Sequence, residues 1–419
     1  MTVAARDLRL EDISLENDDF AERIPHETFA LLRREAPVWW YDWPLGQGYW
    51  CVTRHADVVA ISRDTKTFTS EHGANLEDLD EEQRVARRSM LETDPPRHTR
   101  LRGLVGPPFT PRAIKAYELA LRELTEAVLD RALPLGAFDF VEEIAKQLPI
   151  RVLCQLLGAP DEDTDRLIDW GDRMIGNTDP ELADVLHDSP DSERYRMLPF
   201  RSPAALELFE YGHGLAAERR HRPQDDLVSK LANAEIDGQR LTEQEFDTMF
   251  LILVVAGNET TRQAIAHGML ALIENLDEWK RLVDDQELVW TAAADEILRW
   301  SSPVLHFRRT ATQDVELGGR TIKAGDKVVI WYVSANFDEQ VFEDPLHFDV
   351  GRRPNPHITF GGGGPHFCLG AHLAKLEVQV MFEALVKRVA DMELTGPPER
   401  MRTNFTNALK RMPVRVKIA

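Results

Sequence analysis

Hydrophobic positions recur at helical spacing over most of the chain. Residues 113–133 and 225–236 each place apolar side chains on one face of a helix. Residues 241–276 and 369–390 predict two longer helices. Strand-like patterns occur at 37–55, which is rich in aromatic and turn residues, and near 304–333, where 317–333 resembles a hairpin. The pattern therefore predicts a mainly α protein with small β-sheets.

No repeat, low-complexity tract or change of composition marks a linker, so we expect one domain over residues 1–419. Its β-rich edge is expected at about 37–70 and 304–333, and its helical core at about 95–300 and 368–390. Two irregular stretches, 70–95 and 173–203, are candidates for lids or substrate walls, although tolerated surface loops have the same composition.

The predicted helix 241–276 has an unusual middle. Thr242 and Glu245 form a capping box at its start. The apolar run from Met249 then ends in Gly257, Asn258, Glu259, Thr260 and Thr261. Ala256 and Thr260 share a helix face, so small residues followed by an alcohol and an acid could form a small-ligand pocket with a proton route. A locally distorted helix with a solvated Glu259 is the alternative.

Composition and charge exclude several classes of function. Lys and Arg number 50 against 71 Asp and Glu, which gives a net charge of −21 and argues against binding to nucleic acid or anionic membranes. The N-terminus lacks an apolar signal segment, and the longest apolar run, of nine residues, cannot span a bilayer. Three cysteines far apart do not form a disulfide framework. We therefore expect a cytoplasmic enzyme without a membrane anchor.

Cys368 follows four glycines, a proline and a histidine, at the predicted start of a helix. A helix start lowers the pKa of a thiol, and glycines allow a flat group to approach the backbone. A phosphate loop needs Lys-Ser/Thr where Pro365 and His366 stand, and one cysteine with His366 and His372 matches no usual zinc pattern. A nucleophilic cysteine, an axial thiolate on haem iron and an inert buried cysteine all remain open.

Glu296 and Arg299 are spaced i, i+3 on a predicted helix. Such pairs are frequent and most of them are surface salt bridges, so this pair alone indicates little. Taken together, "RHTRLR", "AGNETT", "EILR" and "FGGGGPHFCLG" occur in the order and approximate spacing of one family. The chain resembles the cytochrome P450 haem-thiolate monooxygenases over most of its length. The cysteine loop has one glycine more than the family's commonest form, so that Phe360 lies eight residues before Cys368.

The resemblance implies the P450 fold, with a long central helix over a haem b, and a role for each matching residue. Cys368 would be the axial iron ligand, in a loop with Phe360 and Gly370. Ala256 and Gly257 would leave room for dioxygen, and Glu259 and Thr260 would deliver protons. The expected propionate contacts are His98, Arg102, Arg308 and His366. Glu296, Arg299 and Arg352 would form a buried structural trio, and Ile252, Val255 and Val304 would line the substrate pocket.

The implied reaction inserts one atom of O2 into a hydrophobic substrate, with sterols, branched lipids and terpenoids as the classes that the motifs resemble. Electrons would come from a separate ferredoxin and its reductase, since the chain has no flavin or iron–sulfur motif of its own. The arginines between Arg84 and Arg102 are a candidate docking surface, and a monomer is expected. A haem-thiolate protein with peroxide-driven or redox-neutral chemistry, or one that only binds ligand, is the alternative.

Overall fold

The computed structural model describes residues 8–236 and 238–419. Helices dominate it, as the hydrophobic pattern predicts. The helices are α1 (His26–Glu35), α2 (His55–Arg63), α3 (Glu81–Arg87), α4 (Arg97–Val105), α5 (Pro111–Ala132), α6 (Gln147–Leu157), α7 (Thr164–Ile175), α8 (Ala204–His221), α9 (Leu227–Ala232), α10 (Glu243–Glu274), α11 (Leu276–Asp284), α12 (Ala294–Ser301), α13 (Tyr332–Ala335) and α14 (Ala371–Arg388).

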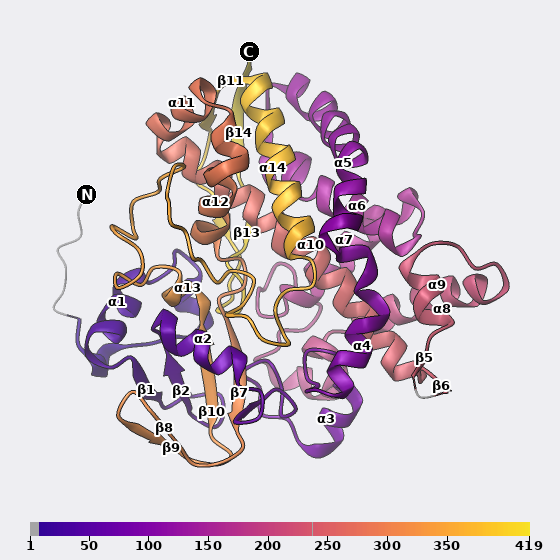
Figure 1. Ribbon diagram of the computed structural model, residues 1–419, viewed down its shortest axis with the longest axis vertical. Coiled ribbons are helices and arrows are strands. Elements are labelled where there is room, and N and C mark those ends of the chain that lie inside the picture. Colours follow the sequence, from indigo (N-terminus) through magenta and orange to yellow (C-terminus); the bar gives the residue numbers. More distant parts are fainter. Residues whose placement is uncertain (1–7, 237) are drawn as a thin grey trace.

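The strands form small sheets at the edges of this helical body. The largest sheet has the order β1-β2-β10-β7-β3, and it lies with α1 and α2 at the bottom of Figure 1. A second sheet has the order β11-β14-β4. The strands are β1 (Val38–Tyr41), β2 (Tyr49–Val52), β3 (Phe68–Thr69), β4 (Ala137–Asp139), β5 (Glu235–Ile236), β6 (Gln239–Arg240), β7 (His306–Ala311), β8 (Val315–Leu317), β9 (Arg320–Ile322), β10 (Lys327–Trp331), β11 (Val389–Leu394), β12 (Glu399–Arg400), β13 (Leu409–Arg411) and β14 (Pro413–Ile418).

Helix α10 runs through the middle of the molecule and packs against α6, α7, α8, α12 and α14. It is buried on nearly all sides, as expected of a helix surrounded by other helices, and its buried residues include polar ones. The predicted capping box is present: Glu245 N donates to Thr242 Oγ1 at 3.2 Å, and Thr242 N donates to the Glu245 carboxylate at 2.9 Å. No helix among the described residues is long and apolar enough to cross a membrane.

Two local predictions were wrong. Residues 317–333 do not form a hairpin, because β9 pairs with β8, whereas β10 joins the large sheet between β2 and β7. The helix expected at 225–236 ends at Ala232, and Glu235–Ile236 is the short strand β5. In both cases pairing with distant or neighbouring strands outweighed the local pattern.

Glu377 of α14 is a buried carboxyl that the sequence motifs do not explain. Its side chain lies against α10 and is only 2% exposed. Burial raises the pKa of Glu377 from 4.5 to about 8, and a hydrogen bond to Thr261 opposes the shift only in part. The folded protein therefore keeps a proton on Glu377 at neutral pH.

This proton makes stability depend on pH. Between the unfolded pKa near 4.5 and the folded pKa near 8, the folded state binds more protons than the unfolded chain, so Glu377 contributes a loss of stability as pH rises. Glu377→Gln is expected to remove a slope of up to about 1.4 kcal/mol per pH unit. Thermal unfolding at pH 5, 7 and 8.5 should show that the stability of the variant, relative to that of the wild type, increases as pH rises. Parallel curves would mean that Glu377 is ionised in the folded protein.

Candidate active site

The cysteine loop lies between the large sheet and α14. Cys368 is two residues before the N-cap, Gly370, and not in the first helical turn as the sequence suggested. Its N–H donates to Phe360 O at 2.9 Å, which closes the loop. An added Cβ at Gly362 or Gly364 would lie 2.8 or 2.4 Å from backbone atoms of α2. These two glycines therefore serve a close approach to α2.

The Cys368 thiol is deeply placed and yet accessible. Its side chain is exposed, although the residue lies far inside the molecule. Burial raises the pKa of the thiol, while the Gly370 N–H and the charge of Arg102 lower it only in part. The helix start alone therefore does not produce the thiolate. A cation bound at the sulfur would supply the missing stabilisation, because a metal-bound thiol loses its proton outright.

Polar groups gather on one side of this loop. The His366 ring lies 4.4 Å from the His98 ring, and its Nε2 is 3.3 Å from Ser70 Oγ and 3.5 Å from Asp94. Burial, followed by the charge of His366, lowers the pKa of His98 to about 4. His98 Nδ1 is buried without a hydrogen-bond partner among the described residues. The charge of Arg102 acts on His366 as well as on the Cys368 thiol.

Arg308 lies apart from this cluster. Its guanidinium donates to Glu77 O at 2.8 Å, on the loop before α3. The neighbouring Arg309 is 4% exposed. The charge of Arg309 acts on His366, and the charge of Asp94 acts on Arg309, so Arg309 lies close to the cluster. Successive side chains of a strand point to opposite faces, so only one of the two arginines can face the cysteine loop. The sequence motif could not decide which, and Arg309 was missed.

Helix α10 supplies the opposite wall. Ala256 is exposed in the middle of a helix whose neighbouring residues are buried, and Thr260 Oγ1 donates to Ala256 O at 2.9 Å. Both residues line a cavity of about 530 Å³. Gly257 does not line it; an added Cβ there would lie 3.1 Å from Leu153 of α6. The expected gap for a small ligand is thus provided by Ala256.

The cavity has the predicted apolar lining close to α10. Ile252, Val255 and Val304 are all part of its wall. The two irregular stretches also line it, through residues within 71–79, 84–92 and 175–201. Further parts of the wall come from residues within 16–17, 43–45, 306–307 and 403–406.

Glu259 lines the same cavity, and its carboxylate is bound by other side chains of α10. It is 2% exposed and pairs with Arg262, while Gln263 Nε2 donates to its carboxylate at 2.8 Å. Arg262 also donates to Asp172 of α7 at 2.7 Å. Asp172 and Arg262 line a second cavity of about 470 Å³. Glu259 therefore lines the first cavity and reaches the second only through its partner Arg262, which the alternative of a solvated acid does not describe.

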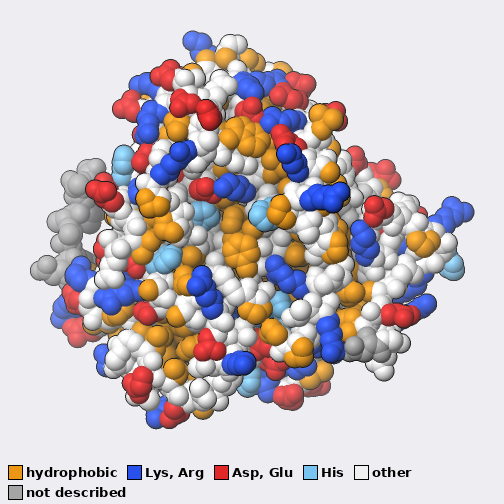
Figure 2. All heavy atoms as spheres, in the orientation of Figure 1, with side chains coloured by type: hydrophobic (Ala, Val, Ile, Leu, Met, Phe, Trp, Pro, Cys, Tyr) orange, Lys and Arg blue, Asp and Glu red, His pale blue; other side chains and the backbone are white. Residues whose placement is uncertain are grey.

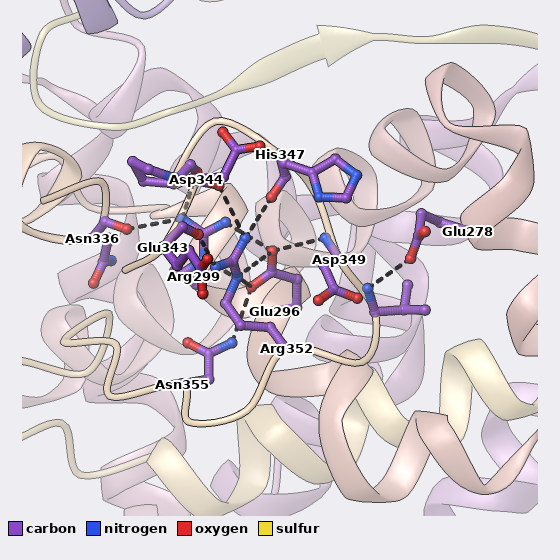
Figure 3. A network of polar contacts seen from close by, with 12 residues as sticks. Glu278, Glu296, Arg299, Asn336, Glu343, Asp344, His347, Asp349, Arg352 and Asn355 are labelled. Atoms are coloured by element: carbon purple, nitrogen blue, oxygen red, sulfur yellow. Dashed lines mark hydrogen bonds and ion pairs between the residues drawn. The ribbon is translucent and has the colours of Figure 1, made fainter. Parts of the chain in front are cut away.

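Glu296, Arg299 and Arg352 come together in the interior (Figure 3). Glu296 and Arg299 are completely buried and form two hydrogen bonds of 2.8 Å. Arg352 Nε donates to both Glu296 oxygens at 3.2 and 3.1 Å, and Asp349 N and Asn355 Nδ2 each donate at 3.0 Å. Arg299 also donates to the backbone oxygens of Asn336 and Pro345. The network holds the irregular segment that precedes the cysteine loop.

These features fit a flat apolar group that carries two carboxylates and a metal ion. Cys368 offers an accessible sulfur, and Ala256 an accessible methyl group inside the core. The cluster of His98, His366, Arg102 and Arg309 offers cations and one unused nitrogen for carboxylates. A zinc site with a second cysteine ligand is not possible there, because Cys51 and Cys154 are buried elsewhere.

Comparison with known proteins gives the family. The family model described as Cytochrome P450 matches residues 17–417. The chain belongs to the cytochrome P450 family. This P450 is 41% identical to a steroid C26-monooxygenase of Mycolicibacterium smegmatis over 406 residues, which are 94% of this chain and 91% of the relative. It is 39% identical to a methyl-branched lipid omega-hydroxylase of Mycobacterium bovis over 419 residues, 97% of this chain and 95% of the relative.

The fold agrees. A Mycobacterium marinum cytochrome P450 in complex with pseudoionone superposes with a TM-score of 0.88 at 39% identity, over 99% of this chain and 100% of that one. The protein is therefore a P450 monooxygenase, and its family and fold imply a haem iron held by a cysteine. The fold class and the resemblance read from the motifs are confirmed.

Proposed function

We propose that this P450 inserts one oxygen atom of O2 into a hydrophobic substrate of the sterol, branched-lipid or terpenoid class. The observation that carries the proposal is the apolar wall of Ile252, Val255 and Val304, which leads to Ala256 and Thr260. Two of the relatives, a steroid C26-monooxygenase and a methyl-branched lipid omega-hydroxylase, point to the same classes. Residues 1–419 would act as one catalytic unit.

Cys368 is the proposed iron ligand, and the Gly370 N–H moderates the charge on its sulfur. The haem, when bound, supplies the activation of dioxygen, and a thiolate ligand favours O–O cleavage. His98, Arg102 and His366 would hold the propionates, and Arg309 is the proposed fourth contact. Arg308 instead supports the loop that carries Glu77. Phe360 belongs to the same loop: its carbonyl accepts from the Cys368 N–H, and its ring lies 6.4 Å from that of Phe367.

Thr260 and Glu259 are the proposed proton donors. The Thr260 hydroxyl lines the cavity and donates its one proton to Ala256 O; after rotating away from Ala256 O it could donate to an oxygen atom bound beside Ala256. Glu259 would resupply Thr260 after taking a proton from the side of Asp172. Arginine cannot relay a proton at neutral pH, so the Glu259 carboxylate has to leave Arg262 for this step.

A ferredoxin is the proposed electron donor, to a monomeric enzyme in the cytoplasm. The arginines between 84 and 102 do not form one surface: Arg87 pairs with Glu77 at the cavity, whereas Arg102 of α4 acts on the cysteine loop. Arg63 reaches the same loop and donates to Gly362 O at 3.1 Å. Figure 2 shows Lys and Arg side chains around a central apolar patch on this face, a charge pattern that suits an acidic partner.

Thr260→Ala is expected to uncouple the reaction. The variant loses the positioned hydroxyl while the cavity keeps its apolar wall, so reductant should be consumed with little product and with release of peroxide. Losses of about 10²-fold or more in product formed are typical when a positioned proton donor is removed. The measurement compares hydroxylated product with reductant consumed, for a steroid ketone and for a branched acyclic terpenoid.

Thr261→Ala is the matched control, because Thr261 is a buried neighbour that does not line the cavity. It should remain coupled. Tight coupling in Thr260→Ala would remove Thr260 from proton delivery. Product formed only with added peroxide, and never with reductant, would favour the peroxide-driven alternative. Absence of product from both compounds would refute the substrate classes.

A further inference from the structure

The wall of the same cavity carries a largely buried ion cluster. Arg87 donates to the Glu77 carboxylate at 2.6 and 3.4 Å, Arg201 donates to it at 2.6 Å, and His187 Nε2 lies 3.4 Å from it. All four residues line the cavity. The Glu77 side chain is 14% exposed and that of Arg87 is 8% exposed. The single carboxylate of Glu77 thus interacts with two arginines and a histidine.

Glu77 is fully ionised in this cluster. Burial opposes ionisation, but the hydrogen bond with His187 and the charge of Arg87 outweigh burial and lower the pKa of Glu77 to about 2. Arg87 also donates to Arg196 O, and Arg201 donates to Ser192 Oγ and Glu193. Both guanidinium groups are thus held by partners within the protein, although Arg87 Nε has no hydrogen-bond partner among the described residues.

The backbone that presents Arg201 is unusual. Phe200 and Arg201 have φ of +59° and +49°, a region that costs a residue with a side chain roughly 1–2 kcal/mol. Phe200 lines the cavity, and Arg201 reaches Glu77 across it from the loop before α8. The favourable pairing with Glu77 offsets this local cost.

No other cation of the described cavity wall is available to an anion. Three arginines line the cavity, and the third, Arg84, pairs with Glu81. Seven carboxylate side chains line it as well. Asp78 is held by Lys327 and Asp188 by Arg402, both from outside the cavity. An ionised ligand would therefore enter a wall in which acids outnumber bases.

We propose that Glu77 occupies the place of a substrate carboxylate on Arg87 and Arg201, and so restricts the cavity to substrates whose polar end is uncharged. The class is that of amphiphiles ending in a ketone, alcohol or ester, and free fatty acids are excluded. The proposal rests on the proposed function, since it concerns the same cavity.

The energetic reason is the cost of displacing Glu77. A substrate carboxylate would either leave Glu77 as an unpaired buried charge or place two carboxylates side by side, and both are unfavourable. An uncharged oxygen needs only one hydrogen bond from the cluster and leaves the ion pairs intact. Glu77 thus determines specificity by charge, whereas the apolar wall determines it by shape.

Optical titration of the ferric protein with a methyl-branched medium-chain acid and its methyl ester tests the proposal. Wild type is expected to bind the ester, and a steroid ketone, and to bind the acid at least about tenfold more weakly, since one unpaired buried charge costs more than 1.4 kcal/mol. Glu77→Gln removes the carboxylate that Arg87 and Arg201 share, so the ratio of acid affinity to ester affinity should rise by about tenfold or more in this variant.

The ratio of acid affinity to ester affinity distinguishes the effect of the Glu77 charge from a general loosening of the loops, because loosened loops would change both affinities together. Glu82→Gln is the matched control: Glu82 pairs with Arg196 in the same loop contact, its side chain is 69% exposed, and it does not line the cavity. Its ratio should equal that of wild type. Arg201→Gln, which leaves Glu77 with Arg87, is a second variant and should still reject the acid.

Acid bound by wild type as tightly as the ester would overturn the proposal, as would an unchanged ratio in Glu77→Gln. Equilibrium dialysis measures the same ratio without requiring the ligand to approach the iron. Ester selectivity in dialysis without any optical shift would count against the proposed function and leave the charge selectivity standing. Equal retention of acid and ester in dialysis would refute the charge selectivity itself.

Discussion

Cys368→Ser is expected to abolish the long-wavelength carbon monoxide band of the reduced protein and to reduce product to background. Cys368 is the accessible cysteine among the described residues, and its sulfur is approached by the Gly370 N–H and by the charge of Arg102. A serine hydroxyl stays protonated under these conditions and cannot supply the electron density that a thiolate gives to iron. Carbon monoxide difference spectra and product analysis measure the two effects.

Cys154→Ser provides the control for this change. Cys154 is buried in α6, and its sulfur lies 3.8 Å from Thr164 Oγ1, a contact that a serine hydroxyl can keep. The band and the activity should persist in this variant. A long-wavelength band retained by Cys368→Ser would exclude Cys368 as the iron ligand.

Glu296→Gln is expected to destabilise the folded protein by about 3–5 kcal/mol, the range for breaking a buried ion pair. The substitution leaves the guanidinium groups of Arg299 and Arg352 buried without a counter-charge. It also replaces one acceptor oxygen by a donor, where Asp349 N and Asn355 Nδ2 now donate (Figure 3). Because the network holds the segment before the cysteine loop, haem retention should fall with stability.

Thermal unfolding and the haem-to-protein absorbance ratio measure this effect. Glu393→Gln makes the same chemical change in an exposed pair with Arg415, in which both side chains are more than 60% exposed. Such pairs contribute about 0–1 kcal/mol, so the control should unfold almost as the wild type does. A Glu296→Gln variant as stable as the control would mean that solvent reaches the trio.

Several features could be predicted because their causes are local in sequence. The capping box of Thr242 and Glu245 and the apolar run after it specify a long buried helix without reference to the remaining chain. The hairpin at 37–55 has its turn between two short alternating strands, and β1 and β2 pair accordingly. Ala256 and Thr260 share a face because of helical geometry alone.

Other features depend on which distant segments meet. Residues 317–333 were read as a hairpin, but the partners of β10 are β2 and β7, which a local pattern does not specify. Arg308 and Arg309 are adjacent in the chain and equivalent as a motif, and only the orientation of β7 in the sheet decides which faces His366. Glu259 was recognised as an acid, while its contact with α7 through Arg262 comes from helix packing.

The sequence by itself determined the family, the mainly helical architecture and the residue types at the proposed iron and oxygen sites, because these lie in short motifs whose chemistry allows few alternatives. Only the tertiary structure decided the surroundings of those residues. Glu77 and Arg201 are separated by 124 positions and hydrogen-bond at 2.6 Å. Charge pairing between distant loops leaves no periodic signal in the chain, so the polar end of the cavity was invisible until the fold brought the two loops together.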